Sequence, residues 1–369
     1  MRIQGNLMLK NQIKLLGNLI KIPAPSGFEE DVAEFIKQEL LQYLPRTRVK
    51  IDSFNNVTAT IKGISNQVIM IDAHIDQIGF MVTNIGNAGA MDGIISIGQI
   101  GGADSSILSA RHLVILTDKG RVNAVVNRRH AHLVTDEKNE TIGFIEEAIV
   151  DIGLRGYRKV NAAVKIGDPV IYRPSFNQLR ASYYSGCGFD DASGCLILIE
   201  TIKEIVKSKK KPIPTLIFTF SAQEETWGKK CRPLVKKYKP DLFIEVDVTF
   251  SSDWSDDEVD ERIAGRCDLG KGIVLYRGLE IDKACFKLIK STAQRHKIKV
   301  QYQASLGSIG YTATDITHEE AGIKALILGI PLRNMHTEVE VINLNDLGYG
   351  IQLLTSFLLH RRIEGVLER

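Results

Sequence analysis

The chain has 369 residues, a formal net charge of +3, and 44% apolar and 25% charged residues. These proportions are typical of a globular protein and exclude disorder, and so small a charge gives no reason to expect nucleic acid as a partner. No run approaches the roughly 18 consecutive apolar residues of a membrane span. Lys10 and Lys14 also interrupt the apolar pattern that a signal peptide would need. We therefore expect a cytoplasmic protein that has no membrane partner.

The first helix signal lies near residue 26. Ser26 and Glu29 have the Ser-x-x-Glu spacing of a capping box, and apolar side chains then recur at helical spacing as far as Leu44. We expect an amphipathic helix that begins at this box.

Four short apolar runs have the pattern of strands buried on both faces. They are residues 68–73, 216–220, 242–246 and 325–330. Helical patterns at 196–206 and 284–292 lie between them. This alternation predicts an α/β fold with a mainly parallel sheet flanked by helices.

One region departs from this alternation. Residues 80–172 are rich in glycine, valine and isoleucine and contain short alternating runs with frequent turn signals. That composition predicts a small β-rich domain inserted into the α/β domain.

Carboxylates and histidines follow the four predicted strands. They are His74 and Asp76, the pair Glu224 and Glu225, Asp247, and His336. Ligand sites of open α/β sheets lie at these strand ends. Asp190 and Asp191 directly precede the predicted helix at 196–206, where negative charge is favourable.

Each motif alone has a structural explanation, as a core pair, a solvated carboxylate pair or a helix cap. Together, the nitrogen and oxygen ligands suit two Zn²⁺, Co²⁺ or Mn²⁺ ions bridged by one carboxylate, with a hydroxide held between the ions. The candidate ligands are His74, Asp190, Glu225, Asp247 and His336. Glu224 remains free to act as a general base. Asp76, two residues after His74, could hydrogen-bond the far nitrogen of that histidine.

The order of these motifs resembles the TET-type, or glutamyl and deblocking, aminopeptidases, whose members have often been labelled endoglucanases or cellulases. The resemblance rests on His74-x-Asp76, Gly188-Phe189-Asp190-Asp191, Glu224-Glu225-x-x-Gly228, Asp247-Val248-Thr249 and Pro331-x-Arg333-x-x-His336. It implies a metal-dependent aminopeptidase that acts on peptides.

The resemblance also implies a role for each site residue. Asp190 would bridge the two metal ions, with His74 and Asp247 on one ion and Glu225 and His336 on the other. Glu224 would be the general base and Asp76 would orient His74. The inserted β-rich domain would mediate dimerisation, and dimers would assemble into a hollow dodecamer.

Three positions depart from the family pattern. Gln77, Ala192 and Asn334 stand where the family usually has Glu, Arg and Tyr. A metal-binding but catalytically silent relative with an assembly or regulatory role is therefore a second hypothesis. Glycoside hydrolysis is a third, although it gives no reason for two histidines at these positions.

The candidate ligands also decide the predicted domain organisation. His74 precedes the β-rich region and the other four ligands follow it, so residues 1–79 and 173–369 would form one catalytic domain that carries the insert 80–172. The sequence does not predict which N-terminal residue the enzyme prefers.

Overall fold

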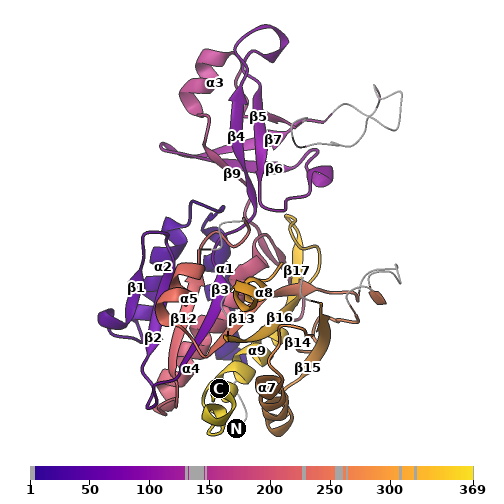
Figure 1. Cartoon of the computed structure of the whole chain (residues 1–369). Coiled ribbons are helices and arrows are strands. Elements are labelled where there is room, and N and C mark those ends of the chain that lie inside the picture. The colour runs from indigo at the N-terminus through magenta and orange to yellow at the C-terminus, as the bar shows by residue number, and fades with distance from the viewer. Residues whose placement is uncertain are drawn as a thin grey trace.

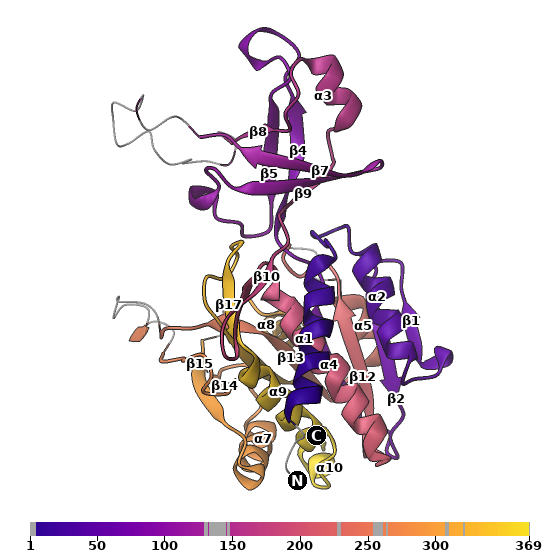
Figure 2. The ribbon, with the colours of Figure 1, turned by 180° about the vertical axis from the view of Figure 1, so that it is seen from behind.

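The computed structural model describes residues 5–128, 132, 145, 148–226, 230–253, 261–262, 265–306, 310–319 and 322–368, with side chains from residue 10 onward. The chain forms two parts, an α/β body and a β-barrel (Figure 1). The barrel lies above the α/β body in this view, and Figure 2 shows the same arrangement from behind.

The α/β body is built on an eight-stranded sheet. In order across the sheet, its strands are β1 (Val49–Ile51), β2 (Val57–Ile61), β12 (Thr215–Ser221), β3 (Val68–His74), β13 (Leu242–Phe250), β16 (Lys324–Leu332), β14 (Ile273–Gly278) and β15 (Val300–Ser305). The central strands β12, β3, β13 and β16 run parallel and contain the four predicted apolar runs. The prediction of a mainly parallel α/β fold is therefore confirmed.

Helices cover both faces of this sheet. Helices α1 (Gly5–Lys21), α4 (Phe189–Ser208) and α9 (Leu344–Leu358) lie on one face, as Figure 2 shows. The shorter α5 (Arg232–Tyr238) and α8 (Thr312–Glu319) lie on the other face (Figure 1). The predicted helix at 196–206 corresponds to α4, and the one at 284–292 corresponds to α7 (Lys283–His296). Helices α2 (Glu30–Leu41) and α10 (Ile363–Leu367) also belong to this body. Single 3-10 turns occur at Arg46–Arg48, Gly89–Met91 and Ser105–Ile107.

The capping box predicted before α2 is wrong. No side chain caps this helix. The hydroxyl of Ser26 instead donates to Asp76 Oδ2 at 2.6 Å, and the Glu29 carboxylate accepts from the Gly27 N–H at 2.6 Å. The Ser26 side chain thus binds the buried carboxylate of Asp76 and accepts no hydrogen bond from an N–H group at the start of α2.

The β-barrel lies between β3 and α4 in the chain. Its six strands close in the order β4 (Gly79–Ile85), β5 (Ile95–Ile100), β8 (Ile149–Asp151), β7 (Gly120–Val126), β6 (His112–Thr117) and β9 (Pro169–Tyr172). Helix α3 (Tyr157–Ala163) packs beside β4. The barrel has an apolar core of its own, in which Phe80 and Tyr172 make an edge-to-face ring contact.

A small antiparallel sheet that the sequence did not predict lies next to the start of α4. Its strands are β10 (Phe176–Arg180), β11 (Tyr183–Gly186) and β17 (Glu340–Asn343). The pairing of Gly186 with Glu340 brings the segment after β16 against the start of α4.

All five cysteines are free thiols, four of them buried and Cys187 half-buried. None of the helices in the described part of the chain has the length and apolar character needed to cross a membrane.

Candidate active site

His74 and Asp247 come from neighbouring parallel strands. His74 is the last residue of β3, and Asp247 lies near the carboxyl end of β13. The Nε2 atom of His74 is 2.9 Å from Asp190 Oδ1 and 3.7 Å from Asp247 Oδ1. All three side chains are buried.

Glu225 and His336 form a second group on the other side of Asp190. The Nε2 atom of His336 is 3.3 Å from Asp190 Oδ2 and 3.3 Å from Glu225 Oε2. The two oxygens of the Asp190 carboxylate therefore face different histidines.

These two groups have the composition of a metal centre. The first group contains His74, Asp190 and Asp247, and the second contains Asp190, Glu225 and His336. Within each group, the possible ligand atoms lie within 4.8 Å of one another. Imidazole nitrogens and carboxylate oxygens suit ions such as Zn²⁺, Co²⁺ and Mn²⁺.

The electrostatics of the cluster also favour a cation. Burial, aided by the nearby Asp190, raises the pKa of Glu225 to about 7. Burial and the nearby Asp191 likewise raise the pKa of Asp247. Burial would lower the pKa of His336, but hydrogen bonds to Asp190 and Glu225 outweigh it and raise that pKa to about 11. The crowded carboxylates thus attract positive charge, which bound divalent ions would supply in place of protons.

The segment around Asp190 is held by a buried carboxylate that sequence reasoning missed. Glu340 Oε2 accepts from the N–H groups of Gly188 at 3.0 Å and Phe189 at 2.7 Å, and its Oε1 accepts from the His336 N–H at 3.2 Å. One side chain on β17 thus fixes the backbone next to two candidate ligands. Its only signal in the sequence is its position four residues after His336.

Asp76 makes more contacts than the sequence predicts. Its carboxylate Oδ1 is 3.5 Å from His74 Nδ1, whereas its own backbone oxygen is nearer, at 3.0 Å. The same carboxylate accepts from the N–H of Glu224 at 2.9 Å and of Glu225 at 3.1 Å. Asp76 therefore holds the Glu224–Glu225 segment as well as lying beside His74.

Glu224 faces the cavity that contains both ligand groups. This cavity has a volume of about 440 Å³. The Glu224 carboxylate accepts from the Thr312 hydroxyl at 3.3 Å, at the start of α8. Glu224 is thus oriented from two sides, by Asp76 through its backbone and by Thr312 through its side chain.

The barrel also reaches this site. The carbonyl oxygen of Gly102, two residues after β5 ends, is 3.2 Å from His336 Nδ1. A carbonyl at this nitrogen fixes the orientation of the imidazole and leaves Nε2 for the ligand group. A salt bridge of 2.7 Å between Arg111 of the barrel and Glu338 supports the same contact.

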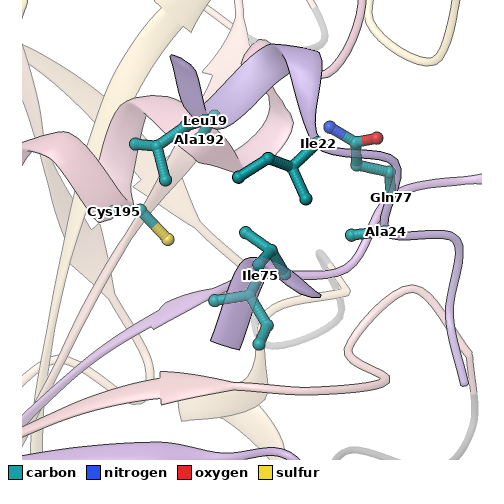
Figure 3. A pocket seen from close by; sticks show the side chains of 8 residues that line it. Leu19, Ile22, Ala24, Ile75, Gln77, Ala192 and Cys195 are labelled. Atoms are coloured by element: carbon teal, nitrogen blue, oxygen red, sulfur yellow. The ribbon is translucent and has the colours of Figure 1, made fainter. Parts of the chain in front are cut away.

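The departures at Gln77 and Ala192 line the same small cavity. Its volume is about 10 Å³, and its apolar side chains come from α1, α2, α4 and the segments that follow α1 and β3 (Figure 3). A Cβ atom at Gly188 would collide with the Gln77 amide, so Gln77 packs against the segment that leads to Asp190. Neither residue belongs to the two ligand groups.

The third departure, Asn334, stabilises the loop that carries His336. Asn334 has φ 55°, a left-handed conformation that asparagine tolerates better than most residues. Its side-chain amide donates to the Val339 carbonyl at 3.1 Å.

Gly102→Ala tests the contribution of the barrel to the site. The added methyl group would lie 2.8 Å from His336 Nδ1, so we expect His336 to move and the affinity of its candidate ligand group for a divalent ion to fall by about tenfold or more. Isothermal titration calorimetry with Zn²⁺ measures this affinity.

Gly348→Ala is the matched control, because a Cβ atom there meets nothing within 4 Å. Unchanged metal binding in Gly102→Ala would show that the barrel loop does not position His336.

Comparison with known proteins assigns the family. Residues 55–353 match the M42 glutamyl aminopeptidase family. The chain is 27% identical to the lysyl aminopeptidase of Pyrococcus furiosus over 350 residues, which cover 94% of this chain and 96% of the relative. It is 25% identical to the glutamyl aminopeptidase of Lactococcus lactis subsp. cremoris over 363 residues, 95% of this chain and 96% of the relative.

A solved structure agrees with these relatives. The TET1 peptidase of Pyrococcus horikoshii superimposes with a TM-score of 0.82 at 26% identity, covering 95% of this chain and 99% of that one. The resemblance found in the motifs is confirmed, and the chain belongs to the M42 glutamyl aminopeptidase family.

Proposed function

We propose that this protein is a dinuclear metal-dependent aminopeptidase that hydrolyses N-terminal residues from peptides. The observation that carries the proposal is the shared carboxylate of Asp190, with Oδ1 2.9 Å from His74 Nε2 and Oδ2 3.3 Å from His336 Nε2. Membership of the M42 aminopeptidase family supports the peptide-hydrolase activity.

The residues present fit two divalent ions, such as Zn²⁺, Co²⁺ or Mn²⁺. Asp190 would contribute to both, with His74 and Asp247 on one side and Glu225 and His336 on the other. When bound, such ions polarise a carbonyl group and lower the pKa of water.

The remaining chemistry belongs to side chains of the chain itself. Glu224 accepts the proton of the attacking water on its carboxylate and returns it to the leaving nitrogen of the peptide. Thr312 and Asp76 hold Glu224 in place through the hydrogen bonds at 3.3 Å and 2.9 Å. Asp76 also fixes the neighbouring ligand Glu225 through its N–H.

Glu224→Gln separates proton transfer from metal binding. We expect turnover of aminoacyl p-nitroanilides and unblocked peptides to fall by about 10²- to 10⁴-fold, because general acid–base catalysis contributes this much. Metal content, measured by mass spectrometry, should stay at the wild-type value. Glu34→Gln, on an exposed side chain of α2, is the matched control and should keep wild-type turnover.

Three outcomes would count against the proposal. If no substrate of the panel shows chelator-sensitive release with the metal-loaded wild type, the protein is not an aminopeptidase. Equal turnover of wild type and Glu224→Gln at full metal occupancy would remove Glu224 from the mechanism. A low, unchanged rate in both would favour the catalytically silent relative.

We also propose a cytoplasmic homo-oligomer in which residues 80–172 form the dimerisation domain and residues 1–79 and 173–369 the catalytic domain. The solved Pyrococcus horikoshii relative assembles into a tetrahedron or a large octahedral shell. Large apolar side chains are exposed on the barrel, among them Met91, Val125, Ile149, Leu154, Tyr157 and Ile166.

Light scattering on the full chain tests this assembly. We expect the mass of several chains, up to a dodecamer, because exposed apolar surface favours association. A particle with the mass of one chain at micromolar concentration would contradict it.

A further inference from the structure

Part of the described lining of the 440 Å³ cavity is apolar, and we call the four residues Val248, Phe250, Tyr311 and Met335 the apolar wall. Beyond the candidate ligands and Glu224, the cavity is lined by Val248, Phe250, Tyr311 and Met335, together with Thr226 and two glycines. None of these carries a charge. The volume suits a large side chain, since small-molecule pockets measure about 300–1,000 Å³.

The hydroxyl of Tyr311 is not available to a bound substrate. It donates to the Val248 carbonyl at 2.7 Å and lies 3.1 Å from the hydroxyl of Tyr276. The hydroxyl of Tyr276 is in turn 2.5 Å from Thr249 Oγ1. This network occupies the hydroxyl of Tyr311, so the aromatic ring is the part of Tyr311 that lines the cavity.

Arginines near the site are engaged by carboxylates. Arg333 binds Asp253 with two hydrogen bonds of 2.6 and 2.8 Å. Arg111 binds Glu338 at 2.7 Å. Neither guanidinium lines the cavity. An acidic side chain of the substrate would therefore find no lysine or arginine among the described lining residues. The positive charge near it would come from the candidate ligand groups.

Among the described lining residues, a basic N-terminal side chain also lacks a partner. The described carboxylates that line the cavity are the candidate ligands and Glu224, whose proposed roles engage them with metal ions and with the reacting water. Placing an ammonium or guanidinium against the apolar wall would desolvate it without compensation.

Phe250 is the residue best placed to contact a substrate side chain. It ends β13, three residues after Asp247, and 59% of its surface is exposed. Covering such a ring with an apolar side chain is favourable by roughly 25 cal/mol per Å² of apolar surface buried.

We propose that this wall receives the N-terminal side chain of the peptide and selects large uncharged residues, such as leucine, methionine and phenylalanine, over acidic, basic and small ones. The proposal rests on the aminopeptidase function proposed above. The relatives named above include one lysyl and one glutamyl enzyme, so family membership does not decide the preference.

The first experiment compares kcat/KM of the metal-loaded enzyme on p-nitroanilides of leucine, methionine, phenylalanine, alanine, glutamate and lysine. We expect the three large uncharged residues to exceed the other three by at least about tenfold, the discrimination that one or more methylene groups provide in an apolar pocket. A higher value for glutamate, lysine or alanine would overturn the preference and leave the aminopeptidase function intact.

The second experiment assigns the preference to Phe250. Phe250→Asp should shift the leucine-to-lysine ratio of kcat/KM toward lysine by about tenfold, because it removes an apolar contact and adds a carboxylate. Tyr302→Asp is the control, since Tyr302 is an exposed aromatic residue outside the cavity, 45% exposed on β15, and should leave the ratio unchanged. An unchanged ratio in Phe250→Asp would remove this residue from the pocket.

A binding measurement keeps the inference testable without turnover. Calorimetry of metal-loaded Glu224→Gln with free L-leucine, L-glutamate and L-lysine should give leucine at least about tenfold tighter binding. Leucine-selective binding, combined with no chelator-sensitive release of any p-nitroanilide by the metal-loaded wild type, would support the pocket and contradict the proposed function. Equal or reversed affinities would overturn the pocket.

Discussion

The carboxylate of Asp190 lies between two histidines, His74 and His336, that are far apart in the chain. Its Oδ1 is 2.9 Å from His74 Nε2, and its Oδ2 is 3.3 Å from His336 Nε2. A buried carboxylate in this position is stable only when positive charge compensates for lost hydration, either as protons on the histidines or as metal ions. The rest of the site follows from the need to hold these three side chains together.

The fold meets that need with a small number of buried carboxylates. The neighbouring parallel strands β3 and β13 bring His74 and Asp247 together toward the carboxyl ends of the strands. Ligand sites of α/β folds lie at these ends. Two further carboxylates then bind backbone N–H groups. Glu340 joins the Asp190 segment to His336, and Asp76 holds the segment that carries Glu224 and Glu225. Hydrogen bonds within the protein thereby hold the segments that carry the candidate ligands Asp190, Glu225 and His336.

Much of the fold could be predicted because its signals are local. Runs such as residues 68–73 and 242–246 are short and mostly apolar, and this pattern is typical of a strand covered on both faces. The candidate ligands could be found because they lie near local signals of this kind. His74 and Asp247 lie in the carboxyl-terminal halves of β3 and β13, Glu225 and His336 follow β12 and β16, and Asp190 lies at the start of α4. His74, Asp190, Glu225, Asp247 and His336 lie together in the structure, although their roles as ligands remain proposals.

The contacts that the sequence could not predict join segments that are far apart in the chain. The bond from Gly188 to Glu340 spans 152 positions, and Gly102 lies 234 positions from His336. No periodicity or motif marks such pairs. Ser26 has the local spacing of a cap, yet its hydroxyl binds Asp76, 50 positions away. The small antiparallel sheet of β10, β11 and β17 could not be predicted, because its strands are short and β10 is largely exposed and lacks an apolar pattern.

The most direct test of this account is a crystal structure of the Zn²⁺-loaded protein, with the ions located by anomalous scattering. The account predicts two ions per chain, one held by His74 and Asp247 and one by Glu225 and His336, with Asp190 bound to both. A single ion, or two ions of which Asp190 binds only one or neither, would contradict it.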